Sequence, residues 1–215
     1  MNVTHSSNNK KLHESVLSSI KKAGLLNSKI TVAVSGGPDS LALLHILNRF
    51  VNQQKIQVVG VHLNHNIREK ESLSDEKYVT QIFKDLNISY EIYSLDIPQL
   101  SKIQKVSIEE AARKARHKFI YDTNLKYDIN TVAMGHTLDD QAESILMHIM
   151  RGAGTNGLKG MELISTRSID NMDLNIFRPL LTFSKSDIEI YCKENGLHPV
   201  IDSTNFSTEY KRNFV

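Results

Sequence analysis

The clearest chemistry in the sequence lies in six consecutive residues at a predicted turn: Ser35, Gly36, Gly37, Pro38, Asp39 and Ser40. An apolar, β-branched run at 30–34 precedes them and an apolar run at 41–47 follows, a pattern that predicts a buried strand, a loop and a helix. Glycines let the backbone approach an anion, and the helix start adds free N–H groups and a positive dipole end. Serine hydroxyls are further donors, and Asp39 could hold a magnesium ion that bridges phosphate oxygens. We therefore expect this loop to bind phosphate.

The loop differs from the two commonest nucleotide-binding loops, because it has neither a Gly-Lys-Ser/Thr ending nor a third glycine at dinucleotide spacing. The structural alternative is a tight turn in which serine and aspartate only cap the helix. The six residues resemble the Ser-Gly-Gly-x-Asp-Ser loop of the N-type ATP pyrophosphatases. Members of that superfamily cleave ATP between its α and β phosphates and transfer AMP to an oxygen that is to be replaced. The resemblance therefore implies adenylation chemistry.

Other polar residues follow apolar runs that are predicted to be strands. His62 and His65 lie at the end of the second such run, and His136 follows the fourth. Strands that alternate with helices predict a parallel sheet, and ligands bind at the carboxyl edge of such sheets. His136 and Asp140 could meet there as a proton donor beside a carboxylate that positions a base or a metal ion.

Each of these residues also has a structural explanation. Asp140 can complete a capping box with Thr137, an interaction that only starts a helix. A zinc site of histidines and aspartates would need a standard ligand spacing, which this sequence lacks, so magnesium with ATP is favoured. Arg113 and Arg116 lie on a predicted helix that begins after Ser107, where the alternative to binding is a solvated basic face.

The remaining pattern predicts an open, Rossmann-like α/β sheet with helices on both faces, followed by a C-terminal hairpin and helix. Strands are expected at 30–34, 56–63, 90–95 and 130–135, and a hairpin over 160–177. We expect an N-terminal helical segment at 1–24, whose first residues, through Asn9, are polar and mobile, and a catalytic domain at 25–215. A last helix at 184–195, with Ile188, Ile190 and Tyr191 apolar, should stop before a glycine. Two further helices are expected to bury apolar faces: Ile108, Ala111, Ala112, Ala115 and Phe119 in the first, and Ala142, Ile145, Leu146, Ile149 and Met150 in the second.

Composition narrows the class of protein. The chain has 215 residues, 40% of them hydrophobic, and a net charge of +2 from 26 basic and 24 acidic residues. A nucleic-acid partner would therefore need a local basic patch. A single cysteine, Cys192, excludes an internal disulfide and a Cys-x-x-Cys site, which fits a reducing, cytoplasmic location. No run reads as a secretory signal or is long enough to span a membrane.

A series of motifs resembles those of the tRNA(Ile)-lysidine synthetases, in the family's order and over nearly the whole chain from residue 30 onward. Besides the loop at 35–40, the motifs comprise residues 62–65, 109–116, 135–143, 151–152, 157–161, 178–181, 202–205 and 212–213. One such motif would be weak support, whereas the whole series is specific. The resemblance implies that ATP adenylates the C2 oxygen of the wobble cytidine in an isoleucine tRNA with a CAU anticodon. The ε-amine of free lysine then displaces AMP and leaves lysidine.

The resemblance also implies roles for individual residues. The loop at 35–40 and His62 would hold ATP, and Asp39 and Asp140 would hold Mg²⁺. Catalytic roles fall on four residues: Asp39, His136, Asp140 and Arg116. Contacts with tRNA fall on basic residues spread over the motifs: His65, Arg113, Arg116, Arg151 and Arg212. A homodimer is compatible with the sequence, which does not fix the oligomeric state.

Family members commonly continue past this point into domains that grip tRNA, so we expect the chain to be a fragment of a longer protein. Three alternatives share the loop. Enzymes that make 2-thiocytidine or 2-thiouridine in tRNA generally need more cysteines than Cys192 alone, and the amidating GMP, NAD and asparagine synthetases match the later motifs less well. A non-catalytic nucleotide-binding module would need only the loop. His136, Asp140 and residues 202–205 favour an enzyme over such a module.

Overall fold

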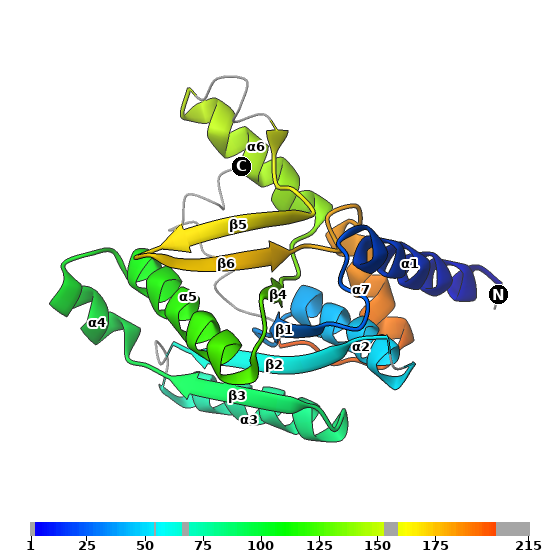
Figure 1. The fold of residues 1–215 in the computed structure, drawn as a ribbon, viewed down its shortest axis with the longest axis horizontal. Coiled ribbons are helices and arrows are strands. Elements are labelled where there is room, and N and C mark those ends of the chain that lie inside the picture. The colour runs from blue at the N-terminus through cyan, green and yellow to red at the C-terminus, as the bar shows by residue number, and fades with distance from the viewer. Residues whose placement is uncertain (1–2, 54, 66–68, 153–158, 201–215) are drawn as a thin grey trace.

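Six strands build the central sheet: β1 (Lys29–Ala33), β2 (Gln57–Asn64), β3 (Ser89–Ser94), β4 (Thr131–Ala133), β5 (Ile164–Ile169) and β6 (Met172–Phe177). Their order in the sheet is β3-β2-β1-β4-β6-β5 (Figure 1). This computed structural model describes residues 3–53, 55–65, 69–152 and 159–200. All neighbouring strands are parallel except β5 and β6, which form an antiparallel hairpin. The predicted α/β class is thus confirmed.

The register of the strands brings their carboxyl ends to one edge. Val32 of β1 pairs with Gly60 of β2 on one side and with Ala133 of β4 on the other. The predicted hairpin extends this sheet, because Phe177 of β6 pairs in parallel with Ala133. Ile30, Val32 and Val132 are fully buried, as expected for central parallel strands that are covered on both faces.

Seven helices complete the described part of the chain: α1 (Val3–Lys22), α2 (Pro38–Asn52), α3 (Glu69–Asp85), α4 (Ile97–Gln104), α5 (Ile108–Tyr127), α6 (Leu138–Met150) and α7 (Lys185–Glu194). Figure 1 shows α5 in front of the sheet and α2 and α3 behind it. The larger core joins residues of α1, α2, α3 and α7 to the sheet, and a smaller core packs Ile120 of α5 against Val132 and Leu174. None of these helices has the length and apolar character that crossing a membrane requires.

The first helix belongs to the larger core. Leu12, Val16 and Ile20 are fully buried there, which confirms the predicted apolar stripe. The helix begins at Val3, so residues 3–9 are part of it. Domain bounds at 24 and 25 stay a prediction, although α1 shares its core with α2 and α7.

Two helices bury their predicted apolar faces only in part. On α5, Ile108 is 46% exposed, whereas the polar residues His117 and Asn124 are buried. Hydrogen bonds explain their burial, because His117 Nε2 bonds to the Met172 carbonyl at 2.7 Å and Thr31 Oγ1 donates to Asn124 Oδ1 at 2.6 Å. On α7, Ile188 and Tyr191 are buried as predicted, but Ile190 is exposed.

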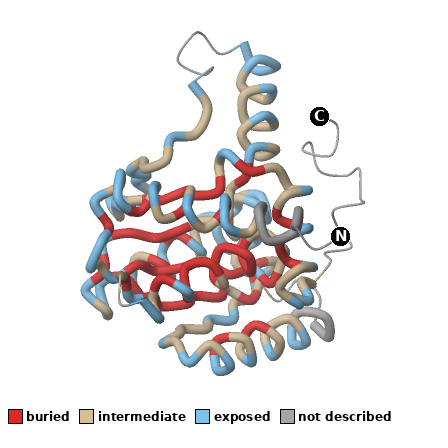
Figure 2. Tube along the Cα trace, turned by 90° about the vertical axis from the view of Figure 1, so that its right-hand side faces the viewer, coloured by how far each residue is buried: buried red, intermediate tan, exposed pale blue. Residues whose placement is uncertain are grey.

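The predicted burial of α6 is wrong. None of its residues is buried, and Leu146, Ile149 and Met150 are 46%, 52% and 74% exposed. Figures 1 and 2 show the helix projecting from the body of the molecule. Its amino-terminal half is tied to the domain by the Leu138 N–H bond to the Phe183 carbonyl at 2.8 Å, and by contacts of Gln141 with Met161 and of Glu143 with Lys185. Its apolar periodicity predicted the helix correctly, but no described element covers that face.

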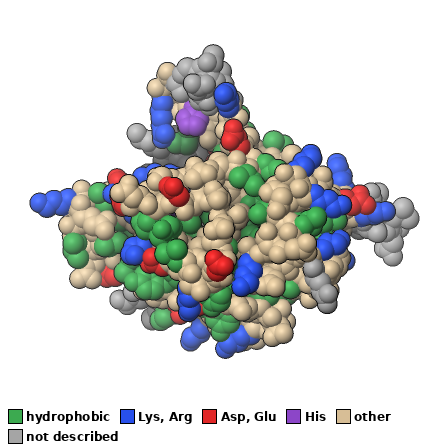
Figure 3. Space-filling view, viewed as in Figure 1, with side chains coloured by type: hydrophobic (Ala, Val, Ile, Leu, Met, Phe, Trp, Pro, Cys, Tyr) green, Lys and Arg blue, Asp and Glu red, His purple; other side chains and the backbone are tan. Residues whose placement is uncertain are grey.

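Charged side chains of both signs are interspersed on the face that Figure 3 displays. No single broad patch of one sign dominates this face. A surface for nucleic acid on this face must therefore be local, in agreement with the near balance of 26 basic and 24 acidic residues.

Candidate active site

Hydrogen bonds within the loop between β1 and α2 fix its backbone conformation. Gly36 has φ +96°, a conformation that suits glycine, and Gly37 precedes the first turn of α2. Ser40 Oγ accepts from the Ser35 N–H at 3.1 Å and donates to the Gly37 carbonyl at 3.0 Å. The Gly37 N–H bonds to Ser35 Oγ at 3.3 Å. The two serines therefore fix the predicted loop shape at the start of a helix, where anions bind.

Asp39 is the unusual residue of this loop. Its Oδ1 atom is buried and has no hydrogen-bond partner in the described part of the chain. Burial, followed by repulsion from Asp140, raises the pKa of Asp39 to about 6, although Lys185 opposes the rise. A buried carboxylate oxygen without a partner costs free energy unless a ligand or ion compensates it. Asp39 is thus prepared for a cation at the phosphate loop.

Gly135 brings the next functional segment against this loop. It follows β4, and a Cβ atom there would lie 2.9 Å from both the carbonyl carbon and the carbonyl oxygen of Asp39, and 3.1 Å from the Ser40 nitrogen. These neighbours are backbone atoms, so they cannot rotate away. Only glycine therefore allows the chain before His136 to touch the first turn of α2.

Replacing Gly135 with alanine is expected to push the β4 end and the phosphate loop apart. The overpacking should lower the free energy of unfolding by about 1–3 kcal/mol and weaken ATP binding. Urea unfolding and calorimetric titration with ATP measure the two effects. Gly24→Ala, at a glycine with φ +68° and no atom within 4 Å of the added Cβ, is the control. It should lower stability without weakening ATP binding, and equal ATP affinity in the Gly135 variant would contradict the close-contact explanation.

His136 lies at the carboxyl end of β4 with a buried Nδ1 atom that has no hydrogen-bond partner among the described residues. Burial, together with the charges of Arg178 and Arg116, lowers the pKa of His136, while Asp140 acts in the opposite direction. The ring is consequently neutral at pH 7, so one nitrogen can accept a proton. A neutral imidazole with an unpartnered nitrogen has the chemistry that a general base requires.

Asp140 forms the predicted helix cap and also lies close enough to the phosphate loop to act on Asp39. Its Oδ2 accepts from the Thr137 N–H at 2.8 Å and from Thr137 Oγ1 at 3.0 Å, which forms the predicted capping box at the start of α6. Its Oδ1 faces Lys185 Nζ at 3.5 Å, and its charge contributes to the raised pKa of Asp39. The capping interaction therefore orients a carboxylate that still acts on the phosphate loop.

Lys185 joins the acidic residues of the site, and sequence reasoning missed it. Its Nζ lies 3.5 Å from Asp140 and 3.5 Å from Glu143, and its backbone N–H donates to Asp139 Oδ2 at 2.7 Å. Burial lowers the pKa of Lys185, but the attraction of Asp140 and Glu143 outweighs it and raises the pKa overall. Forty-six residues separate Lys185 from Asp139 in sequence, so only the fold brings these groups together.

Replacing Lys185 with methionine is expected to move the acidic limb of the pH profile upward. Asp39 then loses the charge that opposes its protonation, so its pKa rises above about 6. For a rise of one unit, the ionised fraction at pH 6 falls about fivefold. ATP-dependent turnover measured from pH 5 to 8 tests this, with Lys185→Arg as the variant that should restore the profile. An unshifted acidic limb in the methionine variant would remove Lys185 from the site.

His62 and His65 lie at the carboxyl end of β2 and directly after it. The His62 Nδ1 atom bonds to the Val34 carbonyl at 2.8 Å, next to the phosphate loop. Arg116 Nη2 bonds to His65 Nε2 at 3.1 Å, and burial, followed by the charges of Arg116 and His62, lowers the pKa of His65 to about 4. A neutral His65 therefore accepts the hydrogen bond and orients Arg116.

Two other predicted residues, Arg113 and Arg151, are exposed, and a third lies outside the described residues. Arg113 is on the exposed surface of α5, and Arg151 follows the exposed end of α6. Arg212 and the segment 202–205 lie outside the described residues. The last described residue, Val200, donates its N–H to the Gly36 carbonyl at 3.0 Å, so this part of the chain contacts the phosphate loop.

Two further residues hold the site together. Arg178 is 8% exposed, and its Nη1 donates to the Glu162 carbonyl at 3.1 Å and to Ser165 Oγ at 2.8 Å. Gln141 Nε2 donates to the Met161 carbonyl at 2.9 Å, and the Met161 N–H donates to Gln141 Oε1 at 2.5 Å. The sequence marked both positions only as parts of motifs. Through these contacts Arg178 holds the start of the hairpin near His136. Gln141 holds the chain at Met161 against α6.

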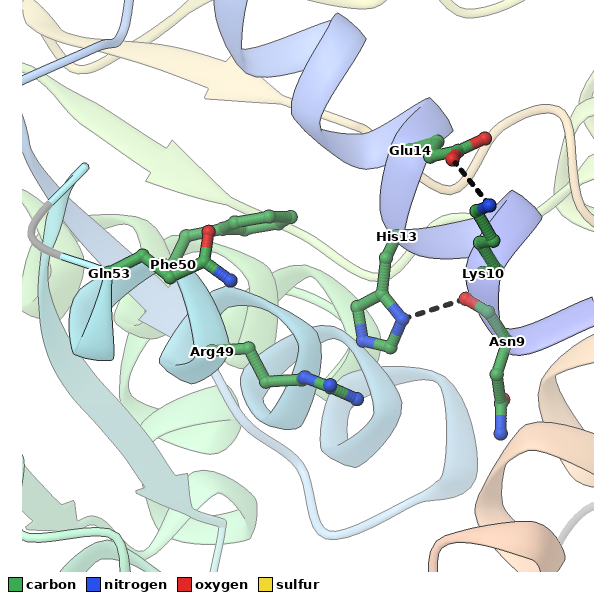
Figure 4. A pocket seen from close by; sticks show the side chains of 7 residues that line it. All are labelled: Asn9, Lys10, His13, Glu14, Arg49, Phe50 and Gln53. Carbon is green, nitrogen blue, oxygen red and sulfur yellow. Dashed lines mark hydrogen bonds and ion pairs between the residues drawn. The ribbon is translucent and has the colours of Figure 1, made fainter. Parts of the chain in front are cut away.

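A hollow beside α1 holds none of these groups. Figure 4 shows this space of about 350 Å³, which is lined by Asn9, Lys10, His13, Glu14, Arg49, Phe50 and Gln53. The His13 Nδ1 atom bonds to the Asn9 carbonyl at 2.7 Å, and Lys10 pairs with Glu14 at 3.9 Å. These polar groups satisfy one another, so we do not assign chemistry to the hollow.

The residues at the carboxyl edge fit ATP with magnesium. The loop offers free N–H groups at the start of α2, and the unpartnered Asp39 oxygen can face a cation. Among the described residues no group of three or more His, Cys, Asp or Glu side chains is arranged to hold a metal by itself. Phosphate oxygens would therefore have to share the coordination of any ion with Asp39.

Together these features define an α/β nucleotide-binding domain whose phosphate loop joins the first strand to a helix. The chain belongs to the PP-loop domain family, whose family model matches residues 6–215. Similar proteins include the tRNA(Ile)-lysidine synthases of Clostridioides difficile and Thermosipho africanus, which are 41% and 40% identical over 206 residues. Those alignments cover 95% of this chain but only 43% and 46% of the two relatives. The chain thus spans less than half the length of these relatives.

Solved structures share the fold. The U34-tRNA thiolase NcsA from Methanococcus maripaludis has a TM-score of 0.76 at 18% identity, covering 94% of this chain and 68% of that chain. The NH3-dependent NAD synthetase from Campylobacter jejuni has a TM-score of 0.58 at 19% identity, covering 97% of this chain and 79% of that chain. These likenesses confirm the predicted fold, and at such identities they concern the fold alone.

Proposed function

We propose that the chain is the ATP-using part of an enzyme that attaches lysine to C2 of the wobble cytidine in a tRNA(Ile) with a CAU anticodon. The observation that carries this proposal is the contact, through Gly135, between the phosphate loop and the segment that bears His136 and Asp140. A phosphate loop alone would bind a nucleotide, whereas this contact adds a base and carboxylates at the reacting end. Similar proteins of up to 41% identity are named tRNA(Ile)-lysidine synthase.

The reaction has two balanced steps. In the first, the C2 oxygen of cytidine attacks the α-phosphorus of ATP, the bond to the β-phosphate oxygen breaks, and pyrophosphate leaves. In the second, the ε-amine of lysine attacks C2, the bond from C2 to the adenylated oxygen breaks, and AMP leaves. The amine must lose protons in this step. Neutral His136, with its unpartnered Nδ1, is the group that we assign to accept one of them.

The chain's other residues bind and orient the reactants. The serines of the loop keep its N–H groups directed at the phosphates, and Asp39 and Asp140 are assigned to a magnesium ion. When bound, that ion supplies positive charge to the departing pyrophosphate. Arg116, held by His65, adds a fixed positive charge near the reacting groups.

Other reactions of this fold fit less well. A sulfur-transfer enzyme that carries an iron–sulfur cluster needs several cysteine thiolates, but the chain has one cysteine. That residue, Cys192, is buried, and burial raises the pKa of its thiol to about 11, which makes it unreactive. A non-catalytic nucleotide-binding module is the second candidate. It leaves the neutral, unpartnered His136 without a role.

A cytoplasmic location and a homodimer complete the proposal. Free lysine and tRNA(Ile) would both be substrates in the cytoplasm, and a single buried thiol suits that reducing compartment. The homodimer rests only on the sequence expectation. Sedimentation of the purified chain tests it, and a monomer at micromolar concentration would remove it from the proposal.

The experiment that tests the function omits one component at a time. The purified chain is incubated with ATP, magnesium, labelled lysine and an unmodified tRNA(Ile) transcript with a CAU anticodon. We expect one AMP and one pyrophosphate for each lysine that enters the RNA, and none of the three products when tRNA is left out. Release of AMP that ignores tRNA, or ATP binding without turnover, would favour the alternatives.

A further inference from the structure

Three arginines lie on the helix α5 and the edge strand β5. We refer to Arg116, Arg113 and Arg167 as the arginine row. Arg116 leans toward β2, because it bonds to His65 at 3.1 Å. Arg113 lies one turn before Arg116 on the same helix, and Arg167 is on the edge strand β5. The row therefore extends from the β2 side of α5 to the far edge of the sheet.

The strand register puts Arg167 on the α5 face. In the hairpin, Arg167 is paired with Leu174, and directly opposed residues of antiparallel strands point to the same face. Leu174 packs in the same core as Ile120 of α5, which fixes that face. Burial and the charge of Arg113 lower the pKa of Arg167, so the two guanidinium groups are close enough to repel each other.

Arg113 and Arg167 differ from the lysines of α5 in their charged partners. Each lysine of this helix has an acidic partner: Lys114 with Glu110 at 3.5 Å, Lys118 with Asp122 at 2.9 Å, and Lys126 with Glu91 at 2.7 Å. Arg113 and Arg167 have no ion pair or hydrogen bond within the part of the chain that the structure describes. Two neighbouring cations without an anion are a favourable site for a phosphate, which arginine binds through two parallel hydrogen bonds.

In the sheet order, β5 lies three strands away from β1, which at about 4.8 Å per strand is roughly 14 Å, so Arg167 lies to one side of the phosphate loop. Besides burial, the charge of Arg167 lowers the pKa of His136 and of Arg178, so the row borders the reacting end of the site. A nucleic-acid strand that leaves the site along α5 would place its phosphates on these arginines. Beside the row, Tyr93 stacks on Phe119 with ring centroids 5.5 Å apart, and Tyr93 is 47% exposed. An exposed aromatic ring next to arginines is the usual surface for an unpaired base.

We propose that the arginine row and the exposed Tyr93 bind a single-stranded stretch of the RNA substrate, with Arg113 and Arg167 on its phosphates. This inference rests on the proposed function and names the surface by which that site receives RNA. It assigns to Arg167 a binding role that the motifs do not suggest. Arg116 would connect the surface to the reacting groups near His136.

Salt-dependent RNA binding tests the proposal. Fluorescence anisotropy of a labelled CAU stem-loop RNA is measured between 50 and 300 mM salt with the wild-type chain, Arg167→Gln and Arg113→Gln. Each variant should bind about fivefold more weakly at 0.1 M salt, and its plot of log affinity against log salt should be shallower by about 0.7. Both residues are exposed, so the variants should fold. Lys29→Gln, an exposed cation at the amino end of β1, is the matched control and should change neither quantity.

The other outcomes are equally clear. No RNA binding by the wild-type chain, unchanged affinity in both arginine variants, or an equal loss in Lys29→Gln would overturn the inference. Weaker ATP binding without weaker RNA binding would assign the row to the nucleotide and also overturn it. Arginine-dependent RNA binding by a chain that never forms lysidine would support the inference and refute the proposed function. Lysidine formation together with unaltered RNA affinity in both variants would support the proposed function and overturn the inference.

Discussion

Replacing Asp39 with asparagine is expected to lower ATP-dependent turnover by about 10³-fold, the size of effect seen when a preorganised electrostatic group is lost. The side chain keeps its shape, but it can no longer neutralise a cation at the phosphate loop. Asp39 is half-buried, is repelled by Asp140, and has a buried Oδ1 atom with no hydrogen-bond partner among the described residues. Its charge therefore disfavours the folded state without a ligand, and the variant should be at least as stable as the wild type.

A loss of turnover without a loss of stability would distinguish a functional role of Asp39 from a structural one. Pyrophosphate release measures turnover, and thermal unfolding without ligand measures stability. Asp122→Asn, which removes an exposed carboxylate from α5, serves as the control and should leave turnover unchanged. Wild-type turnover in Asp39→Asn would show that the loop binds no essential cation through this residue. A large loss of stability would instead make Asp39 a structural residue.

Replacing His136 with glutamine is expected to lower the incorporation of lysine by about 10²–10⁴-fold, the usual contribution of a general base. ATP affinity should stay within about twofold, because the phosphate loop does not depend on the imidazole ring. Burial and the nearby arginines lower the pKa of His136, so the wild-type ring loses its ability to accept a proton only when the pH falls below its usual titration range. The acidic limb of lysine incorporation should therefore contain a His136 contribution in addition to that of Asp39, whose pKa is about 6.

A pH profile of single-turnover lysine transfer tests this assignment. The glutamine variant should lose the His136 contribution and keep that of Asp39. His13 is a suitable control, since it is also a histidine whose pKa burial lowers but it lies in the hollow by α1. His13→Gln should leave the profile unchanged. Normal lysine transfer in His136→Gln would assign proton removal to another group.

Local patterns were enough to predict the phosphate loop and the sheet. The loop is encoded within six residues, and the strands that flank it are apolar on both faces, so neither depends on distant contacts. The hairpin was also predicted, but with a connection over residues 170–173; its turn is only Asp170 and Asn171, whose positive φ values of 51° and 61° these residue types tolerate, and β6 begins at Met172. The PP-loop family assignment confirms what the loop and the motif series implied.

Contacts between distant residues were not predictable in the same way. Lys185 is an ordinary lysine at a helix start in the sequence, and it becomes part of the site only because α7 begins beside the first turn of α6. The bond from Arg116 to His65 likewise joins residues that are 51 positions apart. For α6, periodicity identified an apolar face but could not tell whether any element covers it. The helix α4 was missed, although Asp96 caps it and Pro98 lies in its first turn.

The most direct test of the central claim follows one oxygen atom. A tRNA(Ile) transcript whose wobble cytidine carries ¹⁸O at C2 is incubated with the chain, ATP, magnesium and lysine, and the released AMP is analysed by mass spectrometry. We predict that AMP carries the ¹⁸O label and that the amount equals the lysine incorporated, because the C2 oxygen leaves on the α-phosphate. Unlabelled AMP, or ADP in its place, would contradict adenylation of the cytidine and with it the proposed function.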